Sequence, residues 1–83
     1  MEGEGKMPEW YFDEKTGRWK VCFPKADPYK LKVLTELLLI GEDCRVVYDG
    51  RFWMEWEFSA KKAGWTPTWG RTLSSKEWEK GRV

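Results

Sequence analysis

Seven tryptophans in a chain of 83 residues constrain this sequence more than any other feature. The indole is the largest apolar side chain and also the best stacking platform that a protein has. A chain of this length has room for one modest hydrophobic core. The central question is therefore which tryptophans that core buries and which stay exposed as contact groups.

The composition is typical of one globular domain, because 41% of the residues are hydrophobic and 35% are charged. The formal net charge is only +1, so no overall field directs the protein towards nucleic acids or anionic membranes. The chain contains neither Asn nor Gln, and its high Glu and Lys content is typical of thermophilic proteins.

Cysteine and histidine usage excludes several kinds of site. Cys22 and Cys44 are too few for a disulfide scaffold, and without histidine they cannot complete a common zinc site. We therefore expect no metal and no cofactor. No apolar run approaches the ~18 residues of a membrane span, and the first residues do not resemble a secretory signal. These features predict a cytoplasmic protein that does not contact membranes.

Residues 9–23 alternate between apolar and polar side chains around a turn at residues 14–17. A four-residue loop with Gly17 in the left-handed conformation sets Phe12 opposite Trp19 and Trp10 opposite Val21. One face of this predicted hairpin is apolar: Trp10, Phe12, Trp19, Val21 and Phe23. The other face carries Glu9, Tyr11, Asp13, Arg18, Lys20 and Cys22.

A helix is predicted next, with Asp27 as its N-cap, Pro28 at its first position and a stop at Gly41. Its apolar stripe should lie against a sheet. The stripe comprises Leu31, Val33, Leu34, Leu37 and Leu38. The last turn adds Leu39 and Ile40, which predicts burial of the C-terminal end of the helix.

Residues 44–48 and 51–58 flank Asp49-Gly50, a strong hairpin signal. A two-residue turn would scatter charge into the core, whereas a three-residue loop of residues 48–50, with Gly50 as a bulge, segregates polarity. We predict the second register. Its inner face gathers Cys44, Val46, Phe52, Met54, Trp56 and Phe58, and its outer face shows Arg45, Val47, Arg51, Trp53, Glu55 and Glu57.

After Phe58 the sequence is loop-like and contains Pro67, and Ser74 or Ser75 should cap a short helix that carries Trp78. The fold class is therefore α+β: one small domain of β-hairpin, helix and β-hairpin, with an antiparallel sheet covered on one face by the helix. We expect a flexible tail at residues 1–7, a core domain at 8–58 and a C-terminal extension at 59–83 that packs on or flanks the sheet.

Catalysis has little support in this sequence, because general acid–base chemistry at neutral pH usually relies on histidine. Glu55 and Glu57 share one side of a strand, but a solvated strand face explains them better than paired catalytic carboxylates. A cysteine nucleophile would lack a neighbouring imidazole. We therefore predict a protein that is not an enzyme.

The outer sheet face is the candidate binding site, because it presents Tyr11 and Trp53 among cationic side chains. Single-stranded nucleic acid is bound by such surfaces, where rings stack on bases and cations contact phosphates. The full candidate set is Tyr11, Arg18, Lys20, Arg45, Arg51, Trp53, Trp65, Trp69 and Arg71. In the alternative interpretation, residues from 60 onward fold back and bury Trp53 beneath Trp65 or Trp69.

The expected function is non-enzymatic binding, with single-stranded DNA or RNA as the first candidate partner. The alternative is a protein-binding module or a small inhibitor, for example of viral or mobile-element origin, because Trp, Tyr, Met and Arg dominate interface hot spots. A strand edge could also pair two copies into a homodimer. Affinity that falls steeply with salt would distinguish phosphate contacts from an aromatic protein interface.

Overall fold

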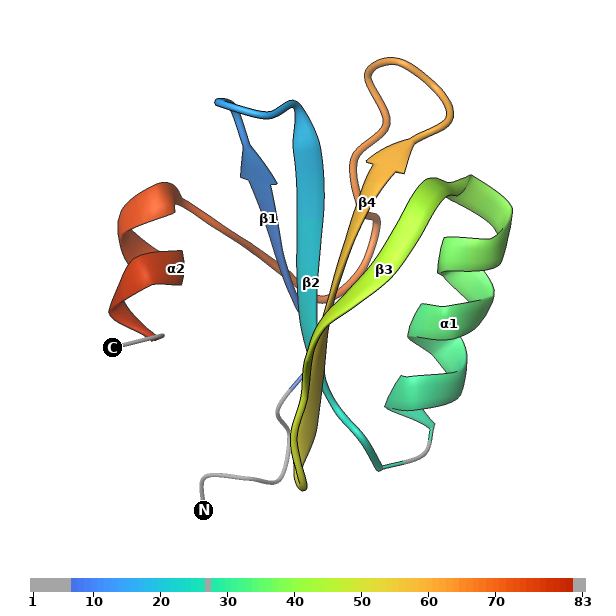
Figure 1. The fold of residues 1–83 in the computed structure, drawn as a ribbon, viewed down its shortest axis with the longest axis vertical. Coiled ribbons are helices and arrows are strands. Elements are labelled where there is room, and N and C mark those ends of the chain that lie inside the picture. The colour runs from blue at the N-terminus through green and yellow to red at the C-terminus, as the bar shows by residue number, and fades with distance from the viewer. Residues whose placement is uncertain (1–6, 27, 82–83) are drawn as a thin grey trace.

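A computed structural model describes residues 7–26 and 28–81. The elements are β1 (Glu9–Asp13), β2 (Arg18–Pro24), α1 (Tyr29–Ile40), β3 (Gly41–Asp49), β4 (Trp53–Ala60), β5 (Arg71–Leu73) and α2 (Ser75–Lys80). The strands form one sheet in the order β3-β4-β2-β1-β5, with α1 and α2 on opposite sides (Figure 1). The predicted α+β class is confirmed. None of the helices in the described part of the chain is long and apolar enough to cross a membrane.

The first hairpin, β1 and β2, has the predicted register. Phe12 pairs with Trp19 and Trp10 pairs with Val21. Gly17 adopts a φ of 74°, the left-handed conformation that the four-residue turn requires. The predicted apolar face therefore forms, and we call it the front face of the sheet.

The second hairpin, β3 and β4, differs from the predicted register. Asp49 pairs with Met54, and the Gly50 N–H donates to the carbonyl of Trp53, so the chain turns at residues 50–52 rather than 48–50. Phe52 consequently lies in the turn with 68% of its surface exposed, not in the core. The reason is that β3 carries an extra residue at two places, between Glu42 and Arg45 and between Val46 and Tyr48, which shifts its alternation.

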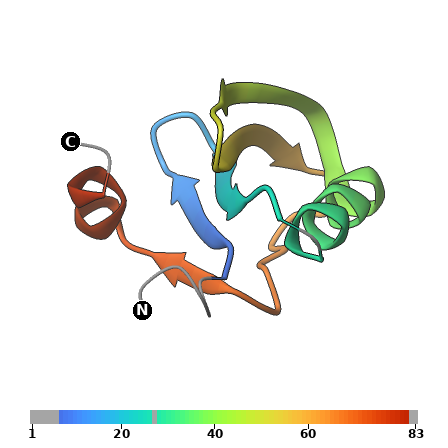
Figure 2. The same cartoon turned by 90° about the horizontal axis from the view of Figure 1, so that it is seen from below.

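Helix α1 and residues 61–70, which we call the cover segment, lie over the front face (Figure 2). Val33 and Leu37 of the helix are buried against the sheet. The fully buried Trp10 has Trp65 and Trp69 of the cover segment as edge-to-face neighbours, at centroid distances of 5.8 and 6.1 Å. This aromatic packing is the main hydrophobic core.

Two expectations for α1 are wrong. Leu31 and Leu38 were placed in the buried stripe and Leu39 in a buried last turn, yet all three are exposed. The helix packs on the core through Val33 and Leu37, with Leu34 and Ile40 half-buried beside them, so its apolar contact is narrower than predicted. The predicted cap, Asp27, lies outside the described residues, and Pro28, which was predicted at the first helical position, is instead the N-cap.

The C-terminal part of the chain returns to the opposite face, the back face. Strand β5 pairs in parallel with β1, so the sheet is mixed rather than purely antiparallel as predicted. Strand β5 has only three residues, which is too short for an alternating pattern to be recognised in the sequence. The predicted short helix is confirmed, with Ser74 and Glu77 forming a reciprocal capping box. Its Trp78 is buried and stacks on Tyr11 at 5.3 Å.

Candidate functional site

The back face of the sheet is arranged in transverse rows of polar side chains. The strand register aligns one row across the sheet as Arg45, Glu57, Lys20, Tyr11 and Leu73. The next row contains Tyr48, Glu55, Cys22, Glu9 and Arg71. Cationic and anionic residues are interspersed in both rows, so this face presents no continuous cationic track.

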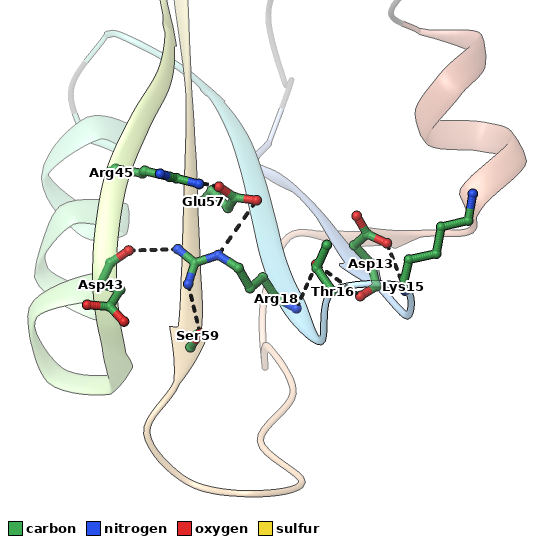
Figure 3. A network of polar contacts seen from close by, with 8 residues as sticks. All are labelled: Asp13, Lys15, Thr16, Arg18, Asp43, Arg45, Glu57 and Ser59. Atoms are coloured by element: carbon green, nitrogen blue, oxygen red, sulfur yellow. Dashed lines mark hydrogen bonds and ion pairs between the residues drawn. The ribbon is translucent and has the colours of Figure 1, made fainter.

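Arg18 is the centre of a polar network that ties the two hairpins together (Figure 3). Its guanidinium donates to the Ser59 hydroxyl at 3.0 Å and to the Asp43 carbonyl at 2.7 Å, and its Nε lies 3.6 Å from a Glu57 oxygen. Arg45 donates to the other oxygen of Glu57 at 3.0 Å. The Glu57 carboxylate pairs with both guanidinium groups, so Arg18 and Arg45 form ion pairs within the sheet.

A second feature of the molecule is a group of exposed apolar side chains on the second hairpin. We call it the hairpin patch, and it consists of Val46, Val47, Tyr48, Phe52 and Trp53. Between 41% and 68% of the surface of each of these residues is exposed. Tyr48 and Trp53 stack with their centroids 5.1 Å apart. The patch wraps around the outer strand β3 and the tip of the hairpin, which is at the bottom of Figure 1.

A groove of about 890 Å³ lies between α2 and the back of the first hairpin. Tyr11 and Trp78 line it, and Lys15 and Lys20 border it from the hairpin. The Tyr11 ring stacks on Trp78 and so packs the sheet against α2. One face of Tyr11 is therefore covered and is not available for stacking on a ligand.

Several predicted site residues are not where the sequence placed them. Trp65 and Trp69 were expected on the same face as Trp53, but both pack against Trp10 on the front face. The expectation that they extend the outer face is therefore wrong. The alternative, in which they bury Trp53, is wrong as well, because Trp53 is 43% exposed.

The cationic members of the predicted site are dispersed. Arg51 is exposed in the turn of the second hairpin, above the ring of Phe52 at 5.2 Å. Arg71 lies at the far side of the sheet, where it is 3.8 Å from Glu9. Lys20 is half-buried between Glu57 and Tyr11 in its row. Among the predicted residues, Tyr11 and Lys20 are paired neighbours on the back face and Arg18 and Arg45 share Glu57, whereas Arg51 and Trp53 lie apart from them at the tip of the second hairpin.

Sequence reasoning missed three members of the hairpin patch. Val46 was assigned to the inner face of the second hairpin, but 43% of its surface is exposed because β3 is the outer strand of the sheet. Tyr48 was assigned to the turn and Phe52 to the core, and the shifted register of β3 is the cause of both errors. The consecutive run of Val46, Val47 and Tyr48 was the available signal, because three apolar residues in a row cannot all face one side of a strand.

The remaining chemistry of the described residues is limited. Burial raises the pKa of the Cys44 thiol, with Arg18 opposing that effect, so the thiol stays protonated at neutral pH. Its sulfur lies 3.9 Å from the Leu37 carbonyl beneath α1. Within residues 7–26 and 28–81, no group of three or more His, Cys, Asp or Glu side chains is placed to hold a metal ion.

Comparisons of the chain with protein-family models, with curated proteins and with solved structures gave no match.

Proposed function

We propose that this chain is a non-enzymatic binding protein that contacts a protein partner through the hairpin patch. One observation carries the proposal: the five patch residues are large, apolar and exposed, and they are concentrated in a single hairpin. Exposed apolar clusters rimmed by charge are typical of protein interaction sites. Tyr, Trp and Phe are also enriched in the cores of such interfaces.

The charge arrangement supports a protein partner over a nucleic acid. Arg18 and Arg45 share Glu57, and Lys25 lies against Asp49 beside the patch. Contact with phosphates would have to compete with these carboxylates, and each lost cation reduces the counterion release that drives nucleic-acid binding.

Single-stranded nucleic acid remains the second candidate, because the stacked pair of Tyr48 and Trp53 is exposed and Arg51 lies next to it in the turn. Two exposed rings and one cation suit one or two bases. A titration of tryptophan fluorescence with single-stranded and duplex oligonucleotides at low and moderate salt tests this candidate. Quenching that saturates and weakens with salt would replace the protein-binding proposal.

The protein-binding proposal is tested by affinity capture with matched variants. The immobilised wild type, Trp53→Ala and Phe12→Ala are each exposed to lysate of the cells that produce the protein. Phe12 is a suitable control because it is 40% exposed, like Trp53, but belongs to the front face of the first hairpin. We expect a protein that is retained by the wild type and by Phe12→Ala and lost with Trp53→Ala, with the affinity then measured on the purified partner.

Equal retention of the captured protein by Trp53→Ala and by the wild type would overturn the role of the patch.

We also propose a cytoplasmic location. It is supported by the two cysteines, since Cys22 lies on the back face and Cys44 on the front face beneath α1, an arrangement that does not suit a disulfide between them. Cell fractionation tests this location.

A further inference from the structure

A cavity lies on the front face, between the turn of the first hairpin and the beginning of the cover segment. It has a volume of about 400 Å³, which is within the range of small-molecule sites in proteins. Phe12 and Trp19 line it from the hairpin, and Lys62 and Trp65 line it from the cover segment. The hairpin turn and the loop after β4 reach the same end of the molecule, at the top of Figure 1. We call this space the front cavity.

The aromatic walls of the front cavity are fixed by the packing of the core. The Trp65 ring meets three others edge to face, at centroid distances of 5.8 Å to Trp10, 5.4 Å to Trp19 and 5.9 Å to Phe58. The Phe12 ring is tilted by 53° against Trp19 at 5.2 Å. Inclined rings form the sides of a hollow rather than a closed stack, so the walls exist before a ligand binds. A preformed site avoids much of the ordering cost of binding.

Phe12 is exposed although it lies on the apolar face of the first hairpin. The exposed fraction of its surface is 40%, compared with 6% for its strand partner Trp19. Strand β5 pairs with β1 only as far as Tyr11. Within the described residues, the Phe12 ring has Trp19 as its one aromatic neighbour. The rest of the Phe12 ring is therefore available to a ligand in the front cavity.

The rim of the front cavity includes two glycines. Gly17 of the hairpin turn and Gly64 of the cover segment both line the cavity, and a Cβ added to either would meet no atom within 4 Å. The mouth is therefore free of side chains at these two points. The Trp65 N–H donates to the Lys62 carbonyl at 3.2 Å, so the turn through Gly64 holds Lys62 beside the aromatic wall.

Among the described residues, the polar side chains that line the front cavity are one cation and two hydroxyls. Lys62 is exposed, and none of the ion pairs between described residues involves it. The Ser59 hydroxyl already accepts a hydrogen bond from Arg18, which leaves Thr66 as the other hydroxyl.

This set of side chains restricts the chemistry of a ligand. A sugar has many hydroxyls whose lost contacts with water need replacement by hydrogen bonds, and the lining offers few. A cationic ligand would be repelled by the Lys62 ammonium, and no acidic side chain of the described residues lines the cavity to attract it. A flat apolar ring that carries an anionic group fits both the walls and the charge.

We propose that the front cavity binds a small aromatic carboxylate, with its ring against Phe12, Trp19 and Trp65 and its carboxylate paired with Lys62. Offset and edge-to-face contacts between rings supply affinity for the flat part of the ligand. The ammonium at the mouth selects the charge, because a carboxylate gains a charge-assisted hydrogen bond there. The site does not depend on the proposed function, because none of its residues belongs to the hairpin patch.

Two-dimensional NMR of the tryptophan indole N–H groups of the full chain tests the proposal, with naphthoate as the probe. The Trp19 and Trp65 signals should shift and saturate with a dissociation constant in the high micromolar range. The Trp53 signal should not move, because Trp53 belongs to the hairpin patch. Naphthamide has the same ring without a charge and should bind several-fold more weakly, and the cation naphthylmethylammonium should bind least.

Two variants and a matched control test the individual contacts. Lys62→Gln should weaken naphthoate binding about twofold to fivefold, as expected for an exposed ion pair, and should leave naphthamide binding unchanged. Lys76→Gln removes the same charge from α2, on the other side of the sheet, and should bind naphthoate like the wild type. Phe12→Ala should weaken the binding of both probes about tenfold through loss of a ring contact. Far-UV circular dichroism verifies that the variants are folded.

Trp19 and Trp65 signals that do not move at millimolar naphthoate would overturn the proposal. Equal affinity for the three probes would contradict the choice of a carboxylate, as would equal effects of Lys62→Gln and Lys76→Gln. Unchanged binding by Phe12→Ala would exclude its ring from the site. A Trp53 signal that shifts together with the other two would mean that the probe adheres to exposed apolar surface in general, which also contradicts the proposal.

Discussion

The two hairpins of this protein have similar alternation in sequence but opposite surroundings in the fold. In the first hairpin, Trp10, Val21 and Phe23 are almost entirely buried. In the second, Met54 and Phe58 of β4 are buried, but Val46, Val47 and Tyr48 of β3 are exposed. The difference follows from the strand order, because β1 and β2 lie inside the sheet whereas β3 is its outer strand.

Alternation alone does not decide whether an apolar residue is buried in the core or exposed at the surface. Each strand of the first hairpin has neighbours on both sides, and the front face above it is covered by the aromatic rings of Trp65 and Trp69. Strand β3 has one neighbour, and two bulges turn its side chains out of register. Apolar residues there stay exposed, and this exposure is the basis of the proposed function.

Replacing one tryptophan in each hairpin by alanine should give the largest difference in the free energy of unfolding. Trp10→Ala removes a fully buried ring and should lower the free energy of unfolding by about 3–5 kcal/mol. Trp53→Ala loses mainly its stacking on Tyr48, so the expected cost is about 1 kcal/mol. Urea denaturation measures both values. Similar losses for the two variants would mean that Trp53 belongs to a core.

Glycines in the cover segment allow the next test, because the Trp65 and Trp69 rings of this segment pack on Trp10 of the first hairpin. Gly70 has a φ of 80°, and an added Cβ would lie 2.6 Å from the Pro8 carbonyl oxygen. Gly64 has a φ of 83° with open space around it. Gly64→Ala should cost about 1–2 kcal/mol from backbone strain alone, and Gly70→Ala about 1–3 kcal/mol more from the clash. Thermal unfolding of both variants checks this order, which equal losses would contradict.

The link between the hairpins can be weakened at Arg18. Arg18→Lys keeps the charge but cannot reach Ser59, Asp43 and Glu57 together, so we expect a loss of about 1–2 kcal/mol. Arg45→Lys is the control, because the Arg45 side chain is 70% exposed and should contribute less than about 1 kcal/mol. Urea denaturation distinguishes the two. A larger effect at Arg45 would mean that the exposed ion pair joins the hairpins.

The smallest effect concerns α2, which packs against β1 and β5. Hydrogen bonds from Ser74 hold the pKa of Glu77 below its usual value. A lowered folded-state pKa contributes stability above the unfolded-state pKa, and this contribution is lost as the pH falls through the folded-state pKa. Glu77→Gln retains a capping side chain without titrating. The wild type should therefore exceed this variant in stability at neutral pH, with the difference shrinking in acid. Urea denaturation at several pH values measures the difference in the free energy of unfolding between the two proteins. A difference that stays constant from neutral to acidic pH would exclude the Glu77 carboxylate as its source.

The candidate site was predictable only in part. Side chains alternate between the two faces of β4, which predicts that Trp53 lies on the outer face. The structure has Trp53 exposed, as predicted. The position of Tyr11 was also correct, but its cover by Trp78 depends on a parallel strand of three residues that has no local signal. Trp65 and Trp69 occur in a segment without periodicity, so their burial against Trp10 arises from long-range packing.

Local patterns in the sequence predicted the first hairpin through alternation and Gly17, the short helix through a serine cap, and the long helix through Pro28 and Gly41. These features depend on contacts between residues close in the chain, where side-chain period and capping chemistry dominate. The order of the strands, and with it the set of apolar residues that stay exposed, depends on long-range packing. That order is set by which large rings pack together across the sheet, a property of the whole chain that no local pattern contains.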